Sequence, residues 1–413
     1  MTTYWSSETT TGYSGGAGNV MDVYGGAFFD LYSLSAPFTW TLNLRDGATY
    51  RIRNSTAAAK NVLNGPVCLA GGTAVVAVGA SKQTTMNGVV SGEGKLFLNS
   101  GSAGRLSLMN GANTYSGGTV VYGGDLYAAS HGSLPGYDSA DTLSVSNGTL
   151  IVNYADGKWS SADVQAFSDK GVLFSETSFL GLSVTNEATL DRALTFPLGS
   201  MSMYDGGTLR VTQPITLGKG ALEVRDGTTL VFDGAFTSSI SSRYSGSTST
   251  SLVLTNGATL QVGSAANSST LAGTQANPAR MFVEAGSTFA ASPECATNVA
   301  TKALSLGHSD GGFGILTVNG GTVRHKIMLG EGNKNGGGAI IQNGGVVENQ
   351  GGAVNDIRYG NAGYGYVELN GGTHTWWGYG TIGGPNESAR GAMYLHGGTF
   401  DYVPKTAVRL GLS

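Results

Sequence analysis

The chain has 413 residues, of which 67 are glycine and only 9 are proline, so glycine is more than twice as frequent as its usual share of about 7%. Charged residues make up 12% and apolar residues 40%, which excludes an intrinsically disordered chain, because disorder needs high charge and low hydrophobicity. The formal net charge of −4 gives no electrostatic attraction to nucleic acid or to an anionic membrane surface.

Residues 1–40 are the least regular part of the sequence. The segment 12–26 is glycine-rich and typical of a loop, and 27–34 is an aromatic-rich stretch that fits one or two strands. The following segments indicate a solenoid, in which the first turn must shield the open end of the core. Residues 1–40 are therefore expected to form an irregular N-terminal cap or the first turns.

Short apolar strands and tight corners alternate over 91–136. Apolar residues occupy every second position, and Asn-Gly or Gly-Gly pairs supply the positive φ of the corners between them. The stretch also resembles the autotransporter passenger-associated repeat, through a motif formed by Leu108, Gly111, Asn113, Tyr115, Gly117, Gly118 and Thr119. This resemblance implies a parallel β-helix exported from a Gram-negative cell.

A change of pattern at 153–181 predicts a helical insert. Ser160 is a favourable N-cap, Val164 and Phe167 share one helix face, and Gly171 suits a C-terminus, so a helix is expected over 161–170. A helical insert before a Leu-Gly-Leu strand, which here begins at Leu180, is also similar to this passenger family. The insert is interpreted either as a docking knob or as a decorated loop.

Corners of the Asp-Gly or Asn-Gly type recur between 200 and 290, at Asp205, Asp226 and Asn256. Each corner precedes a short stretch in which apolar and polar residues alternate, as in a half-buried strand. Between the last two corners, 237–251 consists mostly of serine and threonine. This composition predicts a polar loop or a mobile segment.

The repeat is most regular over 301–413. Its corners are followed by Gly-Gly, mostly with Thr next, and are spaced 24, 27 and 26 residues apart: Asn319, Asn343, Asn370 and His396. Three positions before each corner stands an apolar residue, and these residues should stack into one buried ladder: Leu316, Ile340, Val367 and Met393. A period near 26 accommodates three strands of about five residues with three corners.

These patterns together predict an all-β fold, a right-handed parallel β-helix with turns of about 20–30 residues and one short helical insert. The right hand follows from the general rule for parallel crossovers. The whole of 1–413 is expected to form a single solenoid. Within it, 91–136 is the passenger-type repeat, 153–181 the helical insert, and 301–413 the regular Gly-Gly-Thr turns.

The ends and the cysteines lead to three further expectations. Leu410-Gly411 opens another repeat whose corner would fall near position 423, so the C-terminus is expected to be a cut and not a natural end. The start lacks the basic and apolar segments of a signal peptide, and Met1 is compatible with an added initiator. Cys68 and Cys295 are expected to be unpaired small apolar residues.

The sequence contains no recognisable catalytic constellation. Polysaccharide-degrading β-helix enzymes need clustered carboxylates, and the chain has no Asp-Asp, Asp-x-Asp or Asp-His pair. It also lacks a Gly-x-Ser-x-Gly elbow with polar support, zinc-type Cys/His spacing and the calcium nonapeptide Gly-Gly-x-Gly-x-Asp. No catalytic residue, metal site or cofactor is therefore predicted.

Aromatic residues in the last turns are the candidate ligand-binding residues: Trp376, Trp377, Tyr379, Tyr364, Tyr366 and Tyr394. Exposed aromatic rings stack on sugar rings and also form protein interfaces. The adjacent Trp376 and Trp377 must point to opposite sides of a strand, so one of them should be exposed. The alternative is an aromatic ladder that only covers the wall of the solenoid.

The sequence favours a non-enzymatic, exported, adhesin-like scaffold that presents its β-helix wall to a glycan or a host-surface protein. It should be extracellular or attached to the bacterial cell surface, with no nucleic-acid partner. No stretch of about 18 apolar residues is present to span a membrane as a helix. Two alternatives stay open, a polysaccharide-degrading β-helix enzyme and a structural spacer without a ligand.

Overall fold

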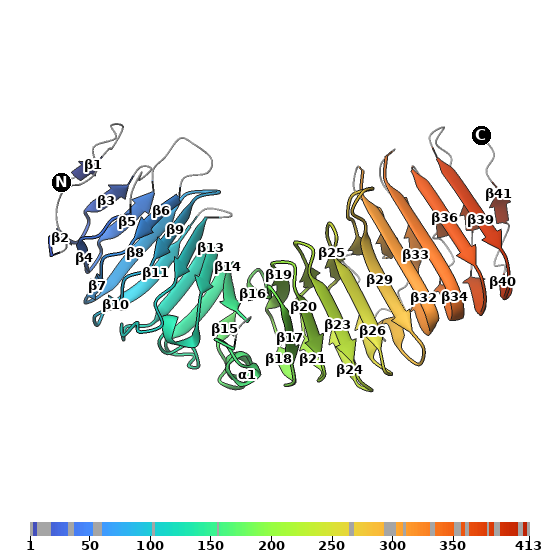
Figure 1. The fold of residues 1–413 in the computed structure, drawn as a ribbon, viewed down its shortest axis with the longest axis horizontal. Helices are drawn as coiled ribbons and strands as arrows, with labels where there is room; N and C mark the ends of the chain where they lie inside the picture. The colour runs from blue at the N-terminus through green and yellow to red at the C-terminus, as the bar shows by residue number, and fades with distance from the viewer. Residues whose placement is uncertain are drawn as a thin grey trace. The chain divides into compact units, whose positions relative to one another are not determined.

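A computed structural model shows strands stacked in parallel ladders (Figure 1). The chain divides into two compact units, Met1–Ser183 and Val184–Ser413. The structure describes residues 3–5, 18–31, 37–52, 60–100, 104–154, 157–263, 268–292, 303–308, 311–330, 335–350, 357–359, 363–377, 380–383, 389–403 and 408–410. The predictions for four parts of the chain lie outside the described residues: 12–17, Cys295, Tyr379 and 411–413.

In the N-terminal unit, three parallel ladders carry the strands. The first contains β1 (Thr3–Trp5), β3 (Phe28–Leu31), β5 (Thr49–Ile52), β8 (Thr73–Val78), β11 (Lys95–Asn99) and the first halves of β13 (Thr119–Ala128) and β14 (Leu143–Asn153). The second contains β6 (Lys60–Leu63), β9 (Gln83–Met86), β12 (Arg105–Leu108), the second halves of β13 and β14, and β16 (Phe179–Ser183). The third contains β2 (Val20–Val23), β4 (Thr41–Arg45), β7 (Val67–Ala70) and β10 (Val90–Ser91).

In the C-terminal unit, every turn contributes to three ladders. The first runs through β17 (Glu187–Leu190), β20 (Thr208–Val211), β23 (Thr229–Asp233), β26 (Ser251–Thr255), β29 (Ala279–Glu284), the first halves of β32 (Phe313–His325) and β34 (Gly337–Gln350), β36 (Tyr364–Leu369) and β39 (Arg390–Leu395). The second runs through β18 (Leu194–Phe196), β21 (Ile215–Leu217), β24 (Thr237–Ile240), β27 (Thr259–Val262), β30 (Thr288–Ala291), the second halves of β32 and β34, β37 (Thr373–Trp377) and β40 (Thr399–Val403).

The third ladder of the C-terminal unit holds shorter strands. They are β19 (Ser200–Tyr204), β22 (Leu222–Val224), β25 (Tyr244–Gly246), β28 (Ser269–Leu271), β31 (Leu304–Leu306), β33 (Ile327–Leu329), β35 (Ile357–Tyr359), β38 (Gly380–Ile382) and β41 (Val408–Leu410). The predicted all-β parallel solenoid is therefore confirmed, and the right-handed winding stays a prediction.

Alternation along each strand places apolar residues inside and polar residues outside. The predicted ladder is confirmed, because Leu316 pairs with Ile340, Ile340 with Val367, and Val367 with Met393. The first three side chains are fully buried, and Met393 is half-buried in the last strand of this ladder. The same inward row extends back through Met281, Leu252 and Leu230 to Leu209.

The corners form as the sequence predicts, through residues with positive φ. Asp205, Asp226 and Asn256 have φ values of 74°, 53° and 54°. In the longest strands the corner does not interrupt pairing: β32 and β34 continue across it with a shift of register at Asn319. Such a shift bends a strand without ending it. At Gly345 a side chain is excluded, because φ is +75° and a Cβ atom would lie 2.0 Å from the carbonyl oxygen of Gly321.

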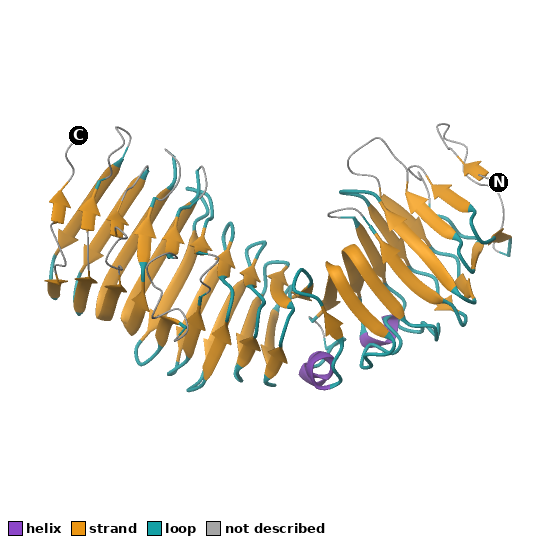
Figure 2. Cartoon of the chain, turned by 180° about the vertical axis from the view of Figure 1, so that it is seen from behind, coloured by secondary structure: helices purple, strands orange, loops and turns teal. Residues whose placement is uncertain are grey.

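The helical insert contains α1 (Ser161–Asp169), which agrees with the predicted helix at 161–170. The Ser160 side chain accepts a hydrogen bond from the Asp163 amide, and the Asp163 carboxylate accepts one from the Ser160 amide. Val164 and Phe167 are fully buried. A short 3-10 helix (His131–Ser133) and β15 (Leu173–Phe174) complete the N-terminal unit, where Figure 2 draws both helices in purple among orange strands.

Three buried side chains of the motif that resembles the passenger repeat form structural hydrogen bonds: Asn113, Tyr115 and Thr119. Asn113 links neighbouring turns, because its Oδ1 accepts from the Val90 amide at 2.8 Å and its Nδ2 donates to the Ser133 carbonyl at 2.9 Å. The Tyr115 hydroxyl lies 2.7 Å from the Thr119 hydroxyl, and both side chains are buried. Asn113 therefore holds neighbouring turns in register from a buried position.

The serine- and threonine-rich segment 237–251 is not a loop, which corrects the sequence-based interpretation. It forms β24, β25 and the start of β26. Ser238 faces inward and is fully buried, and its hydroxyl accepts a hydrogen bond from the Ile215 amide at 2.9 Å. A serine can therefore occupy an interior position when the backbone supplies its partner.

Candidate ligand-binding surface

Strands β36 and β39 place three of the predicted tyrosines on the outer face of the first ladder. Tyr364, Tyr366 and Tyr394, together called the tyrosine surface, occupy outward positions that alternate with inward residues such as Val367. Because Tyr366 pairs with Ala392 and Glu368 with Tyr394, the rings come from neighbouring turns. The ring centroids of Tyr366 and Tyr394 are 5.6 Å apart.

The tyrosine surface is accessible to a large partner. Tyr364 is 54% exposed and Tyr394 is 52% exposed, so both rings present a face to solvent. The imidazole of His396 stacks on Tyr394, with 6.3 Å between centroids and an angle of 8° between the ring planes. A stacked pair holds its ring in one orientation, which suits contact with a flat apolar face of a ligand.

Two polar side chains border the tyrosine surface. The Glu368 carboxylate accepts hydrogen bonds from the Tyr366 hydroxyl at 2.7 Å and from Asn370 Nδ2 at 3.0 Å. The hydrogen bond from Tyr366, and after it the bond from Asn370, lowers the pKa of the Glu368 carboxyl. The bond to Glu368 in turn raises the pKa of the Tyr366 hydroxyl. Glu368 is therefore an ionised acceptor at neutral pH, placed beside exposed rings.

A row of asparagines runs along the corner next to these strands. Asn343 Nδ2 donates to Asn319 Oδ1 at 2.9 Å, and Asn370 Nδ2 donates to Asn343 Oδ1 at 3.0 Å. At the far end, Asn319 Nδ2 donates to Glu284 Oε1 at 3.0 Å. Sequence reasoning aligned these asparagines as corners but did not recognise that aligned amides in successive turns would bond to one another.

The tryptophans do not join the tyrosine surface. Trp376 is 1% exposed and lies inside, edge-on to Phe400 at 6.0 Å, which removes it from the candidate contact residues. Trp377 is 41% exposed, as expected for its neighbour on the strand, but β37 belongs to the second ladder. Thr373 of the Gly-Gly-Thr corner points outward. Because successive side chains of a strand point to opposite faces, Trp376, three positions later, points inward, and this could have been read from the sequence.

Among the described residues, two features of other functional classes are absent. No group of three or more His, Cys, Asp or Glu side chains in them is placed to hold a metal ion. None of the helices in the same part of the chain has the length and apolar character needed to cross a membrane. Cys68 is a half-buried free thiol.

No family model and no curated protein matches the chain. One solved structure, the crystal structure of a TibC-catalysed, hyper-glycosylated fragment of TibA (residues 55–350), aligns over 95% of this chain and all of its own. The sequence identity is 11% and the TM-score 0.25. Nothing about the family or activity of this chain follows from an alignment at that level.

Proposed function

We propose that this chain is a non-enzymatic, exported surface scaffold of autotransporter type that binds saccharides through the tyrosine surface. The single observation that carries the proposal is the pair of half-exposed rings, Tyr364 and Tyr394, on one wall beside the Glu368 carboxylate. Aromatic faces pack against the C–H face of a sugar, and carboxylate and amide groups bond to its hydroxyls. The motif at 108–119 and the parallel solenoid support the export route.

Glycan-array binding followed by calorimetry tests this proposal. Tyr364→Ala and Tyr394→Ala should each weaken binding of a neutral oligosaccharide about three- to tenfold, since an aromatic contact contributes about 1 kcal/mol. Tyr122→Ala is the matched control, because Tyr122 is also an exposed tyrosine, at 49%, but stacks on Phe97 in the N-terminal unit.

Three results would contradict the proposal. If the control and the two variants lose affinity equally, the tyrosine surface is not the contact site. If the purified chain instead shortens polysaccharide substrates, the enzyme alternative is correct. A host-surface protein captured without any saccharide dependence would assign the same wall to a protein partner.

A further inference from the structure

Three corner asparagines of the C-terminal unit have hydrogen-bonding groups that the fold does not use. They are called the asparagine row and follow one another in successive turns: Asn319, Asn343 and Asn370. Asn343 donates one bond to Asn319 and accepts one from Asn370, and its side chain forms no other bond within the described part of the chain. A primary amide has two N–H donors and an oxygen that accepts two bonds, so the exposed Asn343 keeps one of each for a ligand.

An outward column of side chains runs parallel to the asparagine row. Strand pairing aligns its members from β29 to β39 (Figure 1), and they are called the outer column: Phe282, Thr317, Ile341, Glu368 and Tyr394. Phe282 and Ile341 are half-buried although they face outward, and Tyr394 is 52% exposed. The outer column therefore offers an apolar or aromatic surface over several turns.

Hydrogen bonds and strand register place the outer column beside the asparagine row. Asn370 Nδ2 donates to Glu368 Oε1 at 3.0 Å, which joins the two within one turn. One turn earlier the same arrangement recurs, because Ile341 pairs with Glu368 and Asn343 bonds to Asn370. Apolar contacts and amide groups thus repeat together along the wall.

This repeat fits a saccharide chain that runs along the solenoid axis. Neighbouring strands are about 4.8 Å apart, so the three steps from Asn319 to Tyr394 cover about 14 Å. A pyranose ring has an apolar C–H face and hydroxyls at its edge, which match the outer column and the asparagine row. A β-1,4-linked chain is extended and flat, so the same pair of contacts can repeat in successive turns.

Carboxylates at both ends of the asparagine row favour a neutral chain. Glu284 accepts a hydrogen bond from Asn319 at 3.0 Å, and Glu368 accepts one from Asn370 at 3.0 Å. An anionic saccharide in this position would be repelled, whereas the hydroxyls of a neutral one can donate to the carboxylates. The exposed Arg280 lies in the other outward column of β29.

We propose that the outer column and the asparagine row bind a neutral, linear, β-1,4-linked polysaccharide that lies along the solenoid axis. The apolar faces of its sugars contact Phe282, Ile341 and Tyr394, and their hydroxyls bond to the amides of the asparagine row. The inference rests on the proposed function, because Tyr394 belongs to both surfaces, and it deepens that function by naming the class of ligand and its direction.

Isothermal calorimetry on the full chain tests the length of the site with β-1,4-linked dimers and hexamers of glucose, mannose and N-acetylglucosamine. At least one hexamer should bind about tenfold or more tightly than its dimer, because only the hexamer reaches from Tyr394 across the asparagine row. Its affinity should stay the same when NaCl rises from about 50 mM to about 500 mM, since a neutral ligand has no charge to screen. No binding of any hexamer, or equal affinity of each hexamer and its dimer, would overturn the inference.

An acidic hexamer tests the preference for a neutral chain. A β-1,4-linked glucuronate hexamer should bind more weakly than the tightest neutral hexamer, because Glu284 and Glu368 repel its carboxylates. Tighter binding of the glucuronate hexamer would contradict a neutral ligand.

Matched variants locate the site. Asn343→Ala should weaken hexamer binding about two- to tenfold, the loss expected for hydrogen bonds, and leave dimer binding unchanged. Ile341→Ser removes an outward apolar contact without opening the core and should weaken the hexamer by a similar factor. Asn87→Ala is the control, because the exposed Asn87 belongs to a comparable row in the N-terminal unit and donates to Asn64 Oδ1 at 2.8 Å. If Asn343→Ala lowers the melting temperature while the folded protein binds the hexamer as before, the asparagine row is structural and the inference is wrong.

The dimers keep this result apart from the proposed function. Dimer binding that depends on Tyr394, with no gain in the hexamer, would overturn the inference and retain the proposed function. Hexamer binding that depends on Asn343 and is unaffected by Tyr364→Ala and Tyr394→Ala would contradict the tyrosine surface and retain the asparagine row.

Discussion

Position 367 shows how strictly a single strand separates interior from surface. Val367 is fully buried between Ile340 and Met393. The adjacent Glu368 points outward and accepts hydrogen bonds from Tyr366 and Asn370. Burial of such an aliphatic side chain is worth roughly 1.5–3 kcal/mol, and an unpaired buried carboxylate adds a further penalty.

Val367→Asp should therefore unfold the turns around β36, lowering the thermal midpoint far more than Glu368→Ala. The second change removes only solvent-exposed hydrogen bonds, which contribute about 1 kcal/mol or less. Differential scanning calorimetry measures both. Equal shifts of the midpoint for the two variants would show that the register of β36 is wrong.

The buried histidine His374 makes stability depend on pH. Desolvation lowers the pKa of His374 to about 4, and its Nδ1 donates to Gln342 Oε1 at 3.0 Å. In the unfolded chain a histidine titrates near 6.5, so between about pH 6.5 and pH 4 the unfolded state binds more protons than the folded state. The contribution of His374 to the free energy of unfolding is therefore fully present above about pH 6.5. It is lost as the pH falls to about 4, which lowers stability by roughly 3 kcal/mol.

Urea unfolding at a series of pH values measures this effect. His374→Gln should flatten the pH dependence of the unfolding free energy between pH 6.5 and 4, and it should lower stability at neutral pH. His308→Gln changes an exposed histidine and should leave the slope as it is in the unmodified chain. Burial also lowers the pKa of His325, so part of the slope should persist in the His374 variant.

At the scale of elements, one carboxylate attaches α1 to the solenoid. Asp163 accepts from the Ser160 amide at 2.8 Å and also from the Tyr137 hydroxyl, whose ring meets Trp159 edge-on at 5.0 Å. Trp159 is buried and its Nε1 donates to the Ala128 carbonyl at 3.0 Å. The helix is thus fixed both by its cap and by an aromatic cluster.

Asp163→Ala should reduce the local stability of α1 by about 1–2 kcal/mol, because it removes the reciprocal cap and the bond to Tyr137. Hydrogen exchange of the amides at 161–169 is the measurement. Asp169→Ala, in the last turn, should not accelerate exchange, since a negative charge there opposes the helix dipole. Faster exchange in the Asp169 variant than in the Asp163 variant would refute this account of the cap.

At the scale of the whole molecule, each turn contacts its neighbours, so a local defect should stay local. Leu98 on β11 is fully buried and pairs with Val76 and Val121 in the turns on either side. Leu98→Asp should therefore abolish the protection of amides from β8 to β13 and leave β32 to β40 protected. Phe97→Ala, at the adjacent outward position, is the control with little expected effect.

Hydrogen exchange with mass spectrometry resolves these segments. Uniform loss of protection over the whole chain in Leu98→Asp would mean that the solenoid unfolds as one cooperative unit. Loss confined to β8–β13 is the expected result, because each turn is stabilised by its nearest neighbours.

The sequence by itself determined the repeat. The spacing of the Asn-Gly-Gly corners and the alternation around Leu316, Ile340 and Val367 required a parallel solenoid, because a buried row must recur once per turn. The capping residues Ser160 and Gly171 determined α1 in the same way. Both signals are local, so they can be read without knowing which turns meet.

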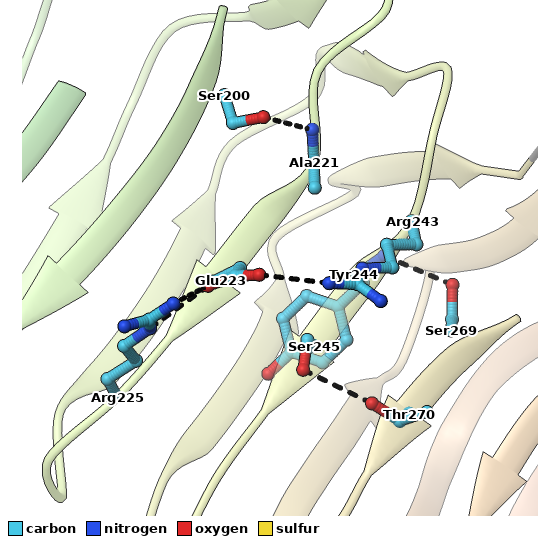
Figure 3. A network of polar contacts seen from close by, with 9 residues as sticks. All are labelled: Ser200, Ala221, Glu223, Arg225, Arg243, Tyr244, Ser245, Ser269 and Thr270. Carbon is cyan, nitrogen blue, oxygen red and sulfur yellow. Dashed lines mark hydrogen bonds and ion pairs between the residues drawn. The ribbon is translucent and has the colours of Figure 1, made fainter. Parts of the chain in front are cut away.

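Tertiary structure alone decided which polar residues are buried and which meet. The segment 237–251 looked like a loop because its serines are polar, yet the buried hydroxyl of Ser238 is satisfied by the Ile215 amide of the preceding turn. The ion pair between Arg243 and Glu223 (Figure 3) and the asparagine row each join residues from different turns. Such contacts depend on the register between turns, which varies with loop length and strand bulges, and no local pattern encodes that register.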